Sequence, residues 1–195
     1  MQLHETQHLM RSLLRGIPHL VLGGVPPERA GEERLAHHRL GIAPGTDLLR
    51  LTSEAFANGE PIPTRYAADG GNAEPPLSWV GVPHHTRSLA LVVEDPDAPT
   101  PLPFVHWLVH SILPSAGSLD AARAAGARVG KNSMFQRGWA GCAPPKGDFA
   151  HRYFFQLFAL DRELTLPSGT GRSALLYALG GHLLACATLI GTYRR

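Results

Sequence analysis

The sequence predicts an all-β sandwich of antiparallel strands with short peripheral and carboxy-terminal helices. Short apolar runs separated by glycine, proline and asparagine recur from residue 48 onwards, which is the pattern of strands joined by turns. The chain contains 21 Gly and 17 Pro in 195 residues, as expected where turns are many. No segment of helix length separates the first four runs, so antiparallel pairing is favoured over parallel strands linked by helices.

Six apolar runs are predicted to be strands. They span residues 48–52, 77–80, 89–93, 105–113, 153–160 and 186–190. The longest connection, residues 115–136, contains SLDAARAAGA, which predicts a helical turn on the surface. Apolar residues at i, i+1, i+4, i+7 and i+8 over 173–184 predict a carboxy-terminal helix, with an interruption at Gly180 and Gly181.

Residues 1–48 are predicted to be a partly helical amino-terminal extension, and residues 49–195 the sandwich domain. Helical spacing of apolar residues predicts one helix over 6–16, and Pro27 at the start with Arg39 near the end predicts another over 27–38. The first helix has an apolar stripe without an assigned partner. Either it packs on the sandwich or it pairs with a second copy of the chain, which would make the protein a homodimer through the extension. The stripe consists of Leu9, Leu13, Leu14 and Ile17.

Composition and charge limit the classes of partner. Lys and Arg total 18, Asp and Glu total 16, and the formal net charge of +2 is too balanced for a phosphate-tracking nucleic-acid surface. The sequence contains neither an 18-residue apolar run nor a secretory signal, which predicts a cytoplasmic protein with no membrane span. Cys142 and Cys186 are then expected to be reduced thiols. His4, His8, His37 and His38 lack the cysteines or clustered carboxylates of a zinc set, so no metal and no cofactor are predicted.

The stretch 137–153, RGWAGCAPPKGDFAHRY, has the composition of a rigid ligand-binding loop. Its glycines permit unusual backbone angles and its paired prolines stiffen it, so that its amides are available as hydrogen-bond donors. His151 and Tyr153 open the next strand on one face, with Arg152 on the other. The alternative interpretation is a surface turn that precedes an ordinary core strand.

Two further segments offer polar groups at strand ends. Asp95 and Asp97 follow an apolar strand and alternate with prolines, and His106 begins the strand FVHWLVHSI, where alternation places it with Leu108 and His110. Imidazoles donate to phosphate oxygens, and a carboxylate can fix the imidazole tautomer. The plainer alternatives are a turn ordered by the two aspartates and a hydrogen-bonded core histidine.

The motifs DPDAP at 95–99, FVHWLVHSI and the loop ending in HRY together resemble the phosphatidylethanolamine-binding protein family, also called the Raf kinase inhibitor protein family. PPLSWVGVP at 75–83 and the ending GHLLACATLIGTYRR are similar to its small bacterial branch. The resemblance covers residues 49–195. It implies the same sandwich and a small cavity that accepts phosphate-like head groups, and it implies a cis peptide at the position of Leu102–Pro103.

The resemblance also implies which residues surround that cavity. In the family these are the positions that match Asp95, His106, Gly141, Pro144, His151 and Tyr153, and the candidate ligand-binding residues are these six together with Asp97 and Ala143. The loop departs from the family pattern, because GWAGCAPP stands where the branch has GYGGPCPP. Methyl groups at Ala140 and Ala143 are expected to narrow the cavity if they face the ligand.

Three classes of function follow. The first is binding of a small anionic or phospholipid head group, with a regulatory role. The second is a protein-interaction module that inhibits a kinase or a protease. The third is a hydrolase using Cys142 with His106 or His151, or using Asp95 with His106. No nucleophile elbow, P-loop or zinc signature is present, so the sequence favours a protein that is not an enzyme.

Overall fold

The computed structural model describes residues 28–45 and 48–195, which form two antiparallel sheets with few helices. The large sheet has the strand order β5-β4-β3-β6-β7, and β1 pairs with β2 in a small one. The predicted fold class is confirmed. The strands are β1 (Arg50–Thr52), β2 (Ser78–Val80), β3 (Ser88–Asp95), β4 (Phe104–Ile112), β5 (Arg128–Val129), β6 (His151–Leu160) and β7 (Leu183–Tyr193).

The helices are short, as the sequence indicates. They are η1 (Glu32–Arg34), α2 (Ala36–Arg39), η2 (Thr64–Tyr66), α3 (Leu119–Ala124) and α4 (Arg172–Leu179). The predicted helix over 27–38 is divided into η1 and α2, because Leu35 adopts an extended conformation between them. The carboxy-terminal helix ends before Gly180, and its predicted last residues belong to β7. The predicted helix over 6–16 and its apolar stripe lie outside the described residues.

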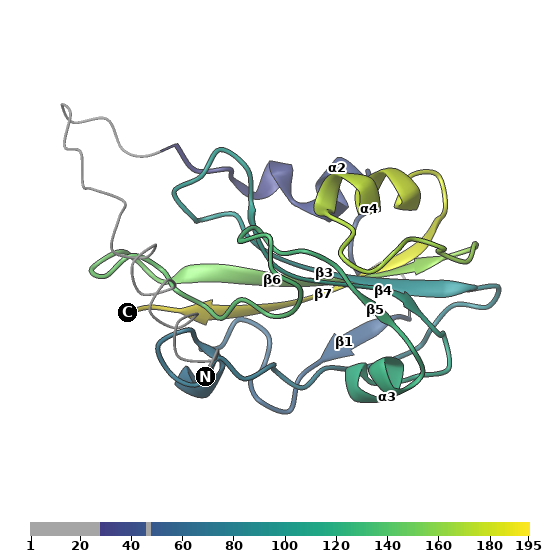
Figure 1. The fold of residues 1–195 in the computed structure, drawn as a ribbon, viewed down its shortest axis with the longest axis horizontal. Coiled ribbons are helices and arrows are strands. Elements are labelled where there is room, and N and C mark those ends of the chain that lie inside the picture. The colour runs from purple at the N-terminus through teal and green to yellow at the C-terminus, as the bar shows by residue number, and fades with distance from the viewer. Residues whose placement is uncertain (1–27, 46–47) are drawn as a thin grey trace, which may run out of the picture.

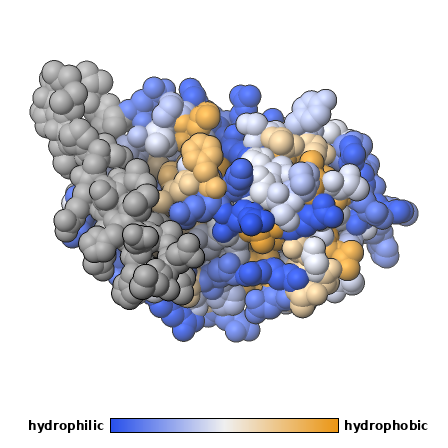
Figure 2. All heavy atoms as spheres, viewed as in Figure 1, coloured by the Kyte–Doolittle hydropathy of each residue, from blue (hydrophilic) through white to orange (hydrophobic). Residues whose placement is uncertain are grey.

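The large sheet lies between two layers (Figure 1). Helices α2 and α4 cover one face, while the small sheet and α3 lie over the other. Alternation along β6 serves both cores: Tyr153 and Phe155 pack toward the small sheet, and Phe158 and Leu160 pack toward the helices. On the face shown in Figure 2, charged and polar residues predominate and apolar residues form small separate groups. Several buried polar side chains lie instead near strand ends, among them Asp95, His106 and His151.

A bulge in β4 sets the direction of His106. Val93 pairs with Trp107 and Glu94 pairs with Val105, so His106 is an extra residue on its strand. Its ring lies against Trp139, which also contacts Trp107, and both tryptophans belong to the core beneath the small sheet. The prediction that His106 shares a face with Leu108 was therefore wrong, because Leu108 packs on the opposite side of the sheet, toward the helices.

Two other features of the structure differ from the predictions. The described residues contain no cis peptide bond, so Leu102–Pro103 is trans, the isomer that X–Pro bonds favour by about 0.5–1 kcal/mol. Strand β5 was not predicted, because two residues are too few to give a periodic pattern.

The described part of the amino-terminal segment is joined to the sheet by a buried polar network. Glu94, fully buried on β3, accepts hydrogen bonds from the Ala36 amide (2.8 Å) and the Gln156 side chain (2.7 Å) and pairs with Arg172. Gln156 in turn accepts from the His37 amide at 3.0 Å. These contacts fix the path of residues 28–45 over the helical layer. The division of the chain at residue 48 stays a prediction.

Replacement of Glu94 is expected to destabilise the fold strongly. Glu94→Ala leaves the Arg172 charge and the Ala36 amide without their partner, so the free energy of unfolding should fall by about 3–5 kcal/mol in urea denaturation. Glu163→Ala is the matched control, because Glu163 is exposed and pairs with the exposed Arg87. It should cost at most about 1 kcal/mol. Equal losses in the two variants would show that the network adds nothing.

Candidate functional site

The site is organised by a contact between the end of β3 and the start of β6. His151 Nδ1 donates to Asp95 Oδ2 at 2.8 Å, and the two side chains are only 1% and 5% exposed. The other oxygen of Asp95 accepts from the backbone amides of Asp97 (2.8 Å) and Ala98 (3.0 Å). Asp95 therefore orders the proline-rich turn with one oxygen and orients an imidazole with the other. From the sequence these two roles were alternatives, and the structure contains both. His151 presents Nε2 on the side away from Asp95.

His106 is fixed by the loop that follows β5. Its Nδ1 donates to the Ala140 carbonyl, and its own carbonyl accepts from the Ala140 amide at 2.9 Å. The ring stands edge-on to Tyr153, with centroids 5.0 Å apart. Among the described residues, nothing hydrogen-bonds to His106 Nε2. In a neutral imidazole that nitrogen is an acceptor, and it becomes a donor once it takes up a proton.

The two histidines have opposite pKa shifts. Burial lowers the pKa of His106, and the nearby His151 lowers it further, against the opposing effects of Asp95 and the Ala140 carbonyl. Burial also acts to lower the pKa of His151, but hydrogen bonds and charges from Asp95 and Asp148 outweigh it, so that pKa is raised. The site therefore combines a charge-favouring imidazole with a neutral one.

The glycine-rich loop contributes packing more than donors. The Gly141 amide donates to Asn72 Oδ1 at 2.7 Å, and a Cβ at this position would lie 2.5 Å from the Ala68 nitrogen. Glycine is required for this close approach. Its amide was expected to donate to a ligand, but it donates to Asn72 instead. Pro144 is held through its carbonyl, which accepts from Arg195 Nε at 2.8 Å. Ala143, half-buried, lies beside the Tyr153 hydroxyl.

Asp97 does not join the histidines. Its carboxylate accepts from the backbone and side chain of Arg152, at distances of 2.7–2.9 Å. Burial acts to raise the pKa of Asp97, but the bonds and charge of Arg152 prevail and lower it. Arg152 lies on the face opposite Tyr153, as alternation predicted, and its guanidinium stands over Phe154. Both oxygens of Asp97 therefore accept from Arg152 and not from either histidine, and a role for Asp97 in ligand binding stays a prediction.

Tyr153 and Cys142 line the buried end of the site. The Tyr153 hydroxyl lies near the Cys142 thiol but makes no hydrogen bond of normal geometry to any described residue. Burial raises the pKa of the Cys142 thiol and, most strongly, the pKa of the Tyr153 hydroxyl. Cys142 is therefore a neutral thiol at neutral pH.

Three residues of the site were not predicted from the sequence: Arg29, Asp148 and Phe149. Arg29 Nη2 donates to Asp148 Oδ2 at 2.7 Å, and Arg29 Nη1 lies 3.3 Å from His151 Nε2. The guanidinium stands 4.7 Å above the Phe149 ring. Asp148 could have been identified from the sequence, because it lies only three residues before His151. Arg29 lies more than 100 residues upstream in a segment without a motif, so nothing in the sequence connects it to the loop.

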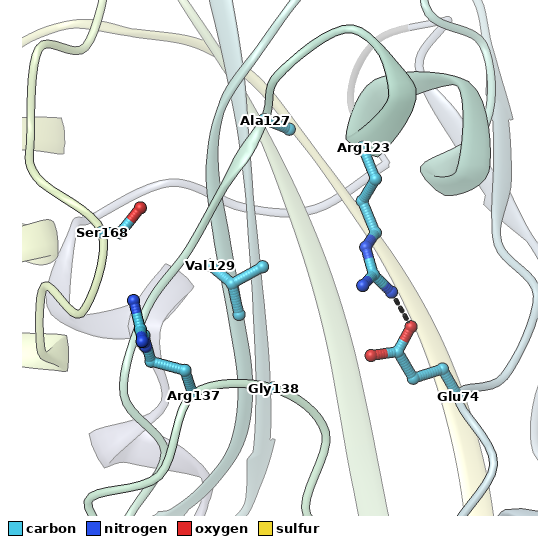
Figure 3. Close-up of a pocket in the computed structure, with 7 residues that line it drawn as sticks. All are labelled: Glu74, Arg123, Ala127, Val129, Arg137, Gly138 and Ser168. Carbon is cyan, nitrogen blue, oxygen red and sulfur yellow. Dashed lines mark hydrogen bonds and ion pairs between the residues drawn. The ribbon is translucent and has the colours of Figure 1, made fainter.

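No group of three or more His, Cys, Asp or Glu side chains within residues 28–45 and 48–195 is arranged to hold a metal ion. None of the helices in this part of the chain is long and apolar enough to cross a membrane. A separate hollow of about 320 Å³ contains no predicted site residue, and its Arg123 is paired with Glu74 (Figure 3). Its lining residues are Glu74, Arg123, Ala127, Val129, Arg137, Gly138 and Ser168.

The fold and the buried Asp95, His106 and His151 define a sandwich protein with a cluster of polar side chains at its strand ends. The sequence profile of the family described as "Phosphatidylethanolamine-binding protein" matches residues 52–194. The chain belongs to the phosphatidylethanolamine-binding protein family, and the resemblance seen in its motifs is confirmed.

Relatives and solved structures agree with this assignment. A protein of Methanothermobacter thermautotrophicus named "UPF0098 protein" is 44% identical over 153 residues, which is 75% of this chain and 99% of that protein. A structure of a Chlamydia trachomatis homologue of the family has a TM-score of 0.71 at 38% identity and covers 77% of this chain and 99% of its own. YbcL of Escherichia coli gives 0.71 at 32% identity, with 76% and 99% covered. The Chlamydia and Escherichia structures support a bacterial branch of the family.

The raised pKa of His151 predicts a pH-dependent stability. A group whose pKa is higher in the folded state stabilises the fold fully below its unfolded value, near 6.5, and this contribution is lost as pH rises through the folded value. The free energy of unfolding should therefore decline above pH 6.5 in the wild type more steeply than in His151→Gln. Urea denaturation from pH 6 to 9 measures both slopes. Parallel curves would mean that His151 is not preferentially charged in the folded state.

Proposed function

We propose that the protein binds a phosphate-like or phospholipid head-group anion at His106 and His151. The observation that carries the proposal is the state of His106, a buried imidazole whose Nδ1 is fixed to the Ala140 carbonyl while Nε2 has no partner among the described residues. An arriving anion can accept a hydrogen bond from this nitrogen after proton uptake. His151, whose pKa is raised, supplies the neighbouring positive charge.

The surroundings of the two histidines suit a ligand with an apolar part. The Phe104 ring lies 4.8 Å from the His106 ring, and the half-exposed Phe149 ring lies 5.3 Å from His151. A hollow of about 310 Å³ begins at Phe104 and includes Leu102 and Pro103. Apolar surface beside an anion site supports a head group that carries a lipid chain, which is the amphiphilic type of ligand the family name describes.

A protein partner is the second candidate. Phe135 is 84% exposed, and Leu102 and Phe149 are also exposed around the loops that lead to the site. Exposed aromatic and aliphatic side chains are typical of protein interfaces.

The regulatory role, the cytoplasmic location and dimerisation through residues 1–48 stay predictions. A relative in Mycobacterium tuberculosis, 39% identical over 152 residues, bears the name "Putative lipoprotein LppC".

The hydrolase hypothesis receives less support. Cys142 is buried and its raised pKa disfavours the thiolate that a nucleophile requires. Asp95 orients His151 and not His106, so the proposed Asp95 and His106 pair is not formed as a hydrogen bond. That the protein is not an enzyme stays a prediction, which a turnover screen with phosphate esters would test.

Calorimetry with O-phosphoethanolamine tests the binding proposal. Each charge-assisted hydrogen bond contributes about 1.5–3 kcal/mol, so His106→Ala and His151→Ala should each weaken binding roughly ten-fold to a hundred-fold. His182→Ala is the control, since His182 pairs with Asp161 away from the site. Circular dichroism establishes that each variant is folded. Wild-type affinity in both variants would exclude His106 and His151 as the binding site.

The lowered pKa of His106 predicts how binding depends on pH. Proton uptake at His106 accompanies anion binding, so affinity should rise as the pH falls below about 6.5. Sulfate is the suitable probe, because it does not titrate in this range as phosphate does. His106→Gln keeps a donor but does not titrate, and its affinity should vary much less between pH 7.5 and 5.5. A wild-type affinity independent of pH would contradict proton uptake.

A further inference from the structure

Asp148 already occupies the position of an anion at His151, on the side of the ring away from Asp95. Its Oδ2 accepts from Arg29 Nη2 at 2.7 Å and lies 3.2 Å from His151 Nε2. One carboxylate oxygen therefore contacts two cationic groups, at the imidazole nitrogen opposite the one that Asp95 holds. Carboxylate and phosphate oxygens accept hydrogen bonds from the same donors, since arginine and charged imidazole pair with either anion.

Arg29 is placed at this point by an anchored backbone. Ala30 is buried, and the Gly31 amide donates to the Pro96 carbonyl at 3.2 Å, beside the turn that Asp95 orders. The guanidinium donates to the Asp97 carbonyl and stands over the Phe149 ring. Side-chain exposures of 26% for Arg29 and 18% for Asp148 show that the ion pair remains open to solvent. A small anion can therefore reach it without unfolding of the segment.

Asp148 stays charged at every working pH. Partial burial acts to raise its pKa, but hydrogen bonds from Arg29, His151 and the Phe149 amide prevail and lower the pKa to about 2. An anionic ligand at His151 meets this carboxylate as a neighbour of like charge, which disfavours binding. If the carboxylate moves away, Arg29 and His151 Nε2 both become available to the ligand.

We propose that Asp148 is an internal competitor for the anion site and that Arg29 is a ligand-contacting residue, so that a bound phosphate replaces Asp148 on Arg29 and on His151. This inference rests on the proposed function. It adds a residue outside the matched region, 52–194, to the recognition of the ligand. It also defines the ligand chemistry as an anion with at least two oxygens, one for Arg29 and one for the imidazoles. A phosphate monoester and a phosphodiester head group both satisfy this requirement.

The sign of the effect separates replacement from a merely structural ion pair. Asp148→Asn removes the competing charge and should bind phosphate roughly three-fold to ten-fold more tightly, while Arg29→Gln removes a donor and should bind it roughly ten-fold or more weakly. If the pair only held the loop in place, both substitutions would break the same contact and weaken binding alike. Opposite changes are expected only if Asp148 competes with the ligand.

Isothermal titration calorimetry on the full chain provides the test. The probes are inorganic phosphate, O-phosphoethanolamine and a soluble short-chain phosphatidylethanolamine, which distinguish free phosphate, a monoester and a lipid diester. Asp161→Asn matches the charge change of Asp148→Asn at a distant exposed pair, and Arg34→Gln matches Arg29→Gln within the same segment, where Arg34 binds the Pro101 carbonyl. Both controls should keep wild-type affinity, and thermal unfolding shows that all variants are folded.

The outcomes distinguish this inference from the proposed function. Binding that is tightened by Asp148→Asn and weakened by Arg29→Gln supports replacement, as does binding that appears only in Asp148→Asn. If wild-type binding requires His106 while Asp148→Asn is no tighter or Arg29→Gln is no weaker, the inference is wrong and the proposed function stands. If neither the wild type nor Asp148→Asn binds any of the probes, both are wrong.

Discussion

The Asp95 carboxylate is the constraint on which the site depends. Its two oxygens perform different tasks: one accepts from two amides of the turn after β3, and the other accepts from His151 at the start of β6. Strands β3 and β6 pair directly, with Glu94 opposite Phe154, so these two ends are neighbours in the sheet. A buried carboxylate is tolerated only when its hydrogen-bonding capacity is used, and here the turn and the imidazole use it. The path of the chain after β3 and the orientation of His151 are therefore fixed by one residue.

The bulge in β4 supplies the second half of the site. Without the extra residue, strict alternation would direct His106 to the same side as Leu108, which faces the helices. The bulge instead turns His106 and Trp107 toward the same core, where Trp139 packs against both rings. The Ala140 carbonyl then fixes the tautomer of His106. Bulges near functional sites commonly redirect a side chain in this way.

Sequence patterns predicted the strands, which depend on local periodicity, and the site residues that lie in the motifs. Six strands follow from apolar runs near β1, β2, β3, β4, β6 and β7, and the motif DPDAP with the HRY ending indicated Asp95 and His151. What the sequence does not reveal is the competition between hydrogen-bonding partners. The sequence does not show that Asn72 takes the Gly141 amide or that Arg152 takes both oxygens of Asp97, because each donor or acceptor is assigned only when the chain is folded. Arg29 is the extreme case, since its position depends on a segment that the family motifs do not include.

The charges at the exposed side of the site bear on the ligand that it would accept. Arg29 and His151 oppose Asp95 and Asp148, while burial keeps His106 neutral, so the group of five carries no net charge when His151 is protonated. Movement of Asp148 out of the site leaves one uncompensated positive charge, which matches a phosphodiester head group. Proton uptake at His106 adds a second, which matches a fully ionised phosphate monoester. The two events are separate in space, because Asp148 contacts His151 at Nε2, the nitrogen beside Arg29, whereas His106 lies beside Tyr153. The charge of the preferred ligand should therefore depend on the protonation state of His106, with diesters favoured when this imidazole is neutral and dianions favoured when it is charged.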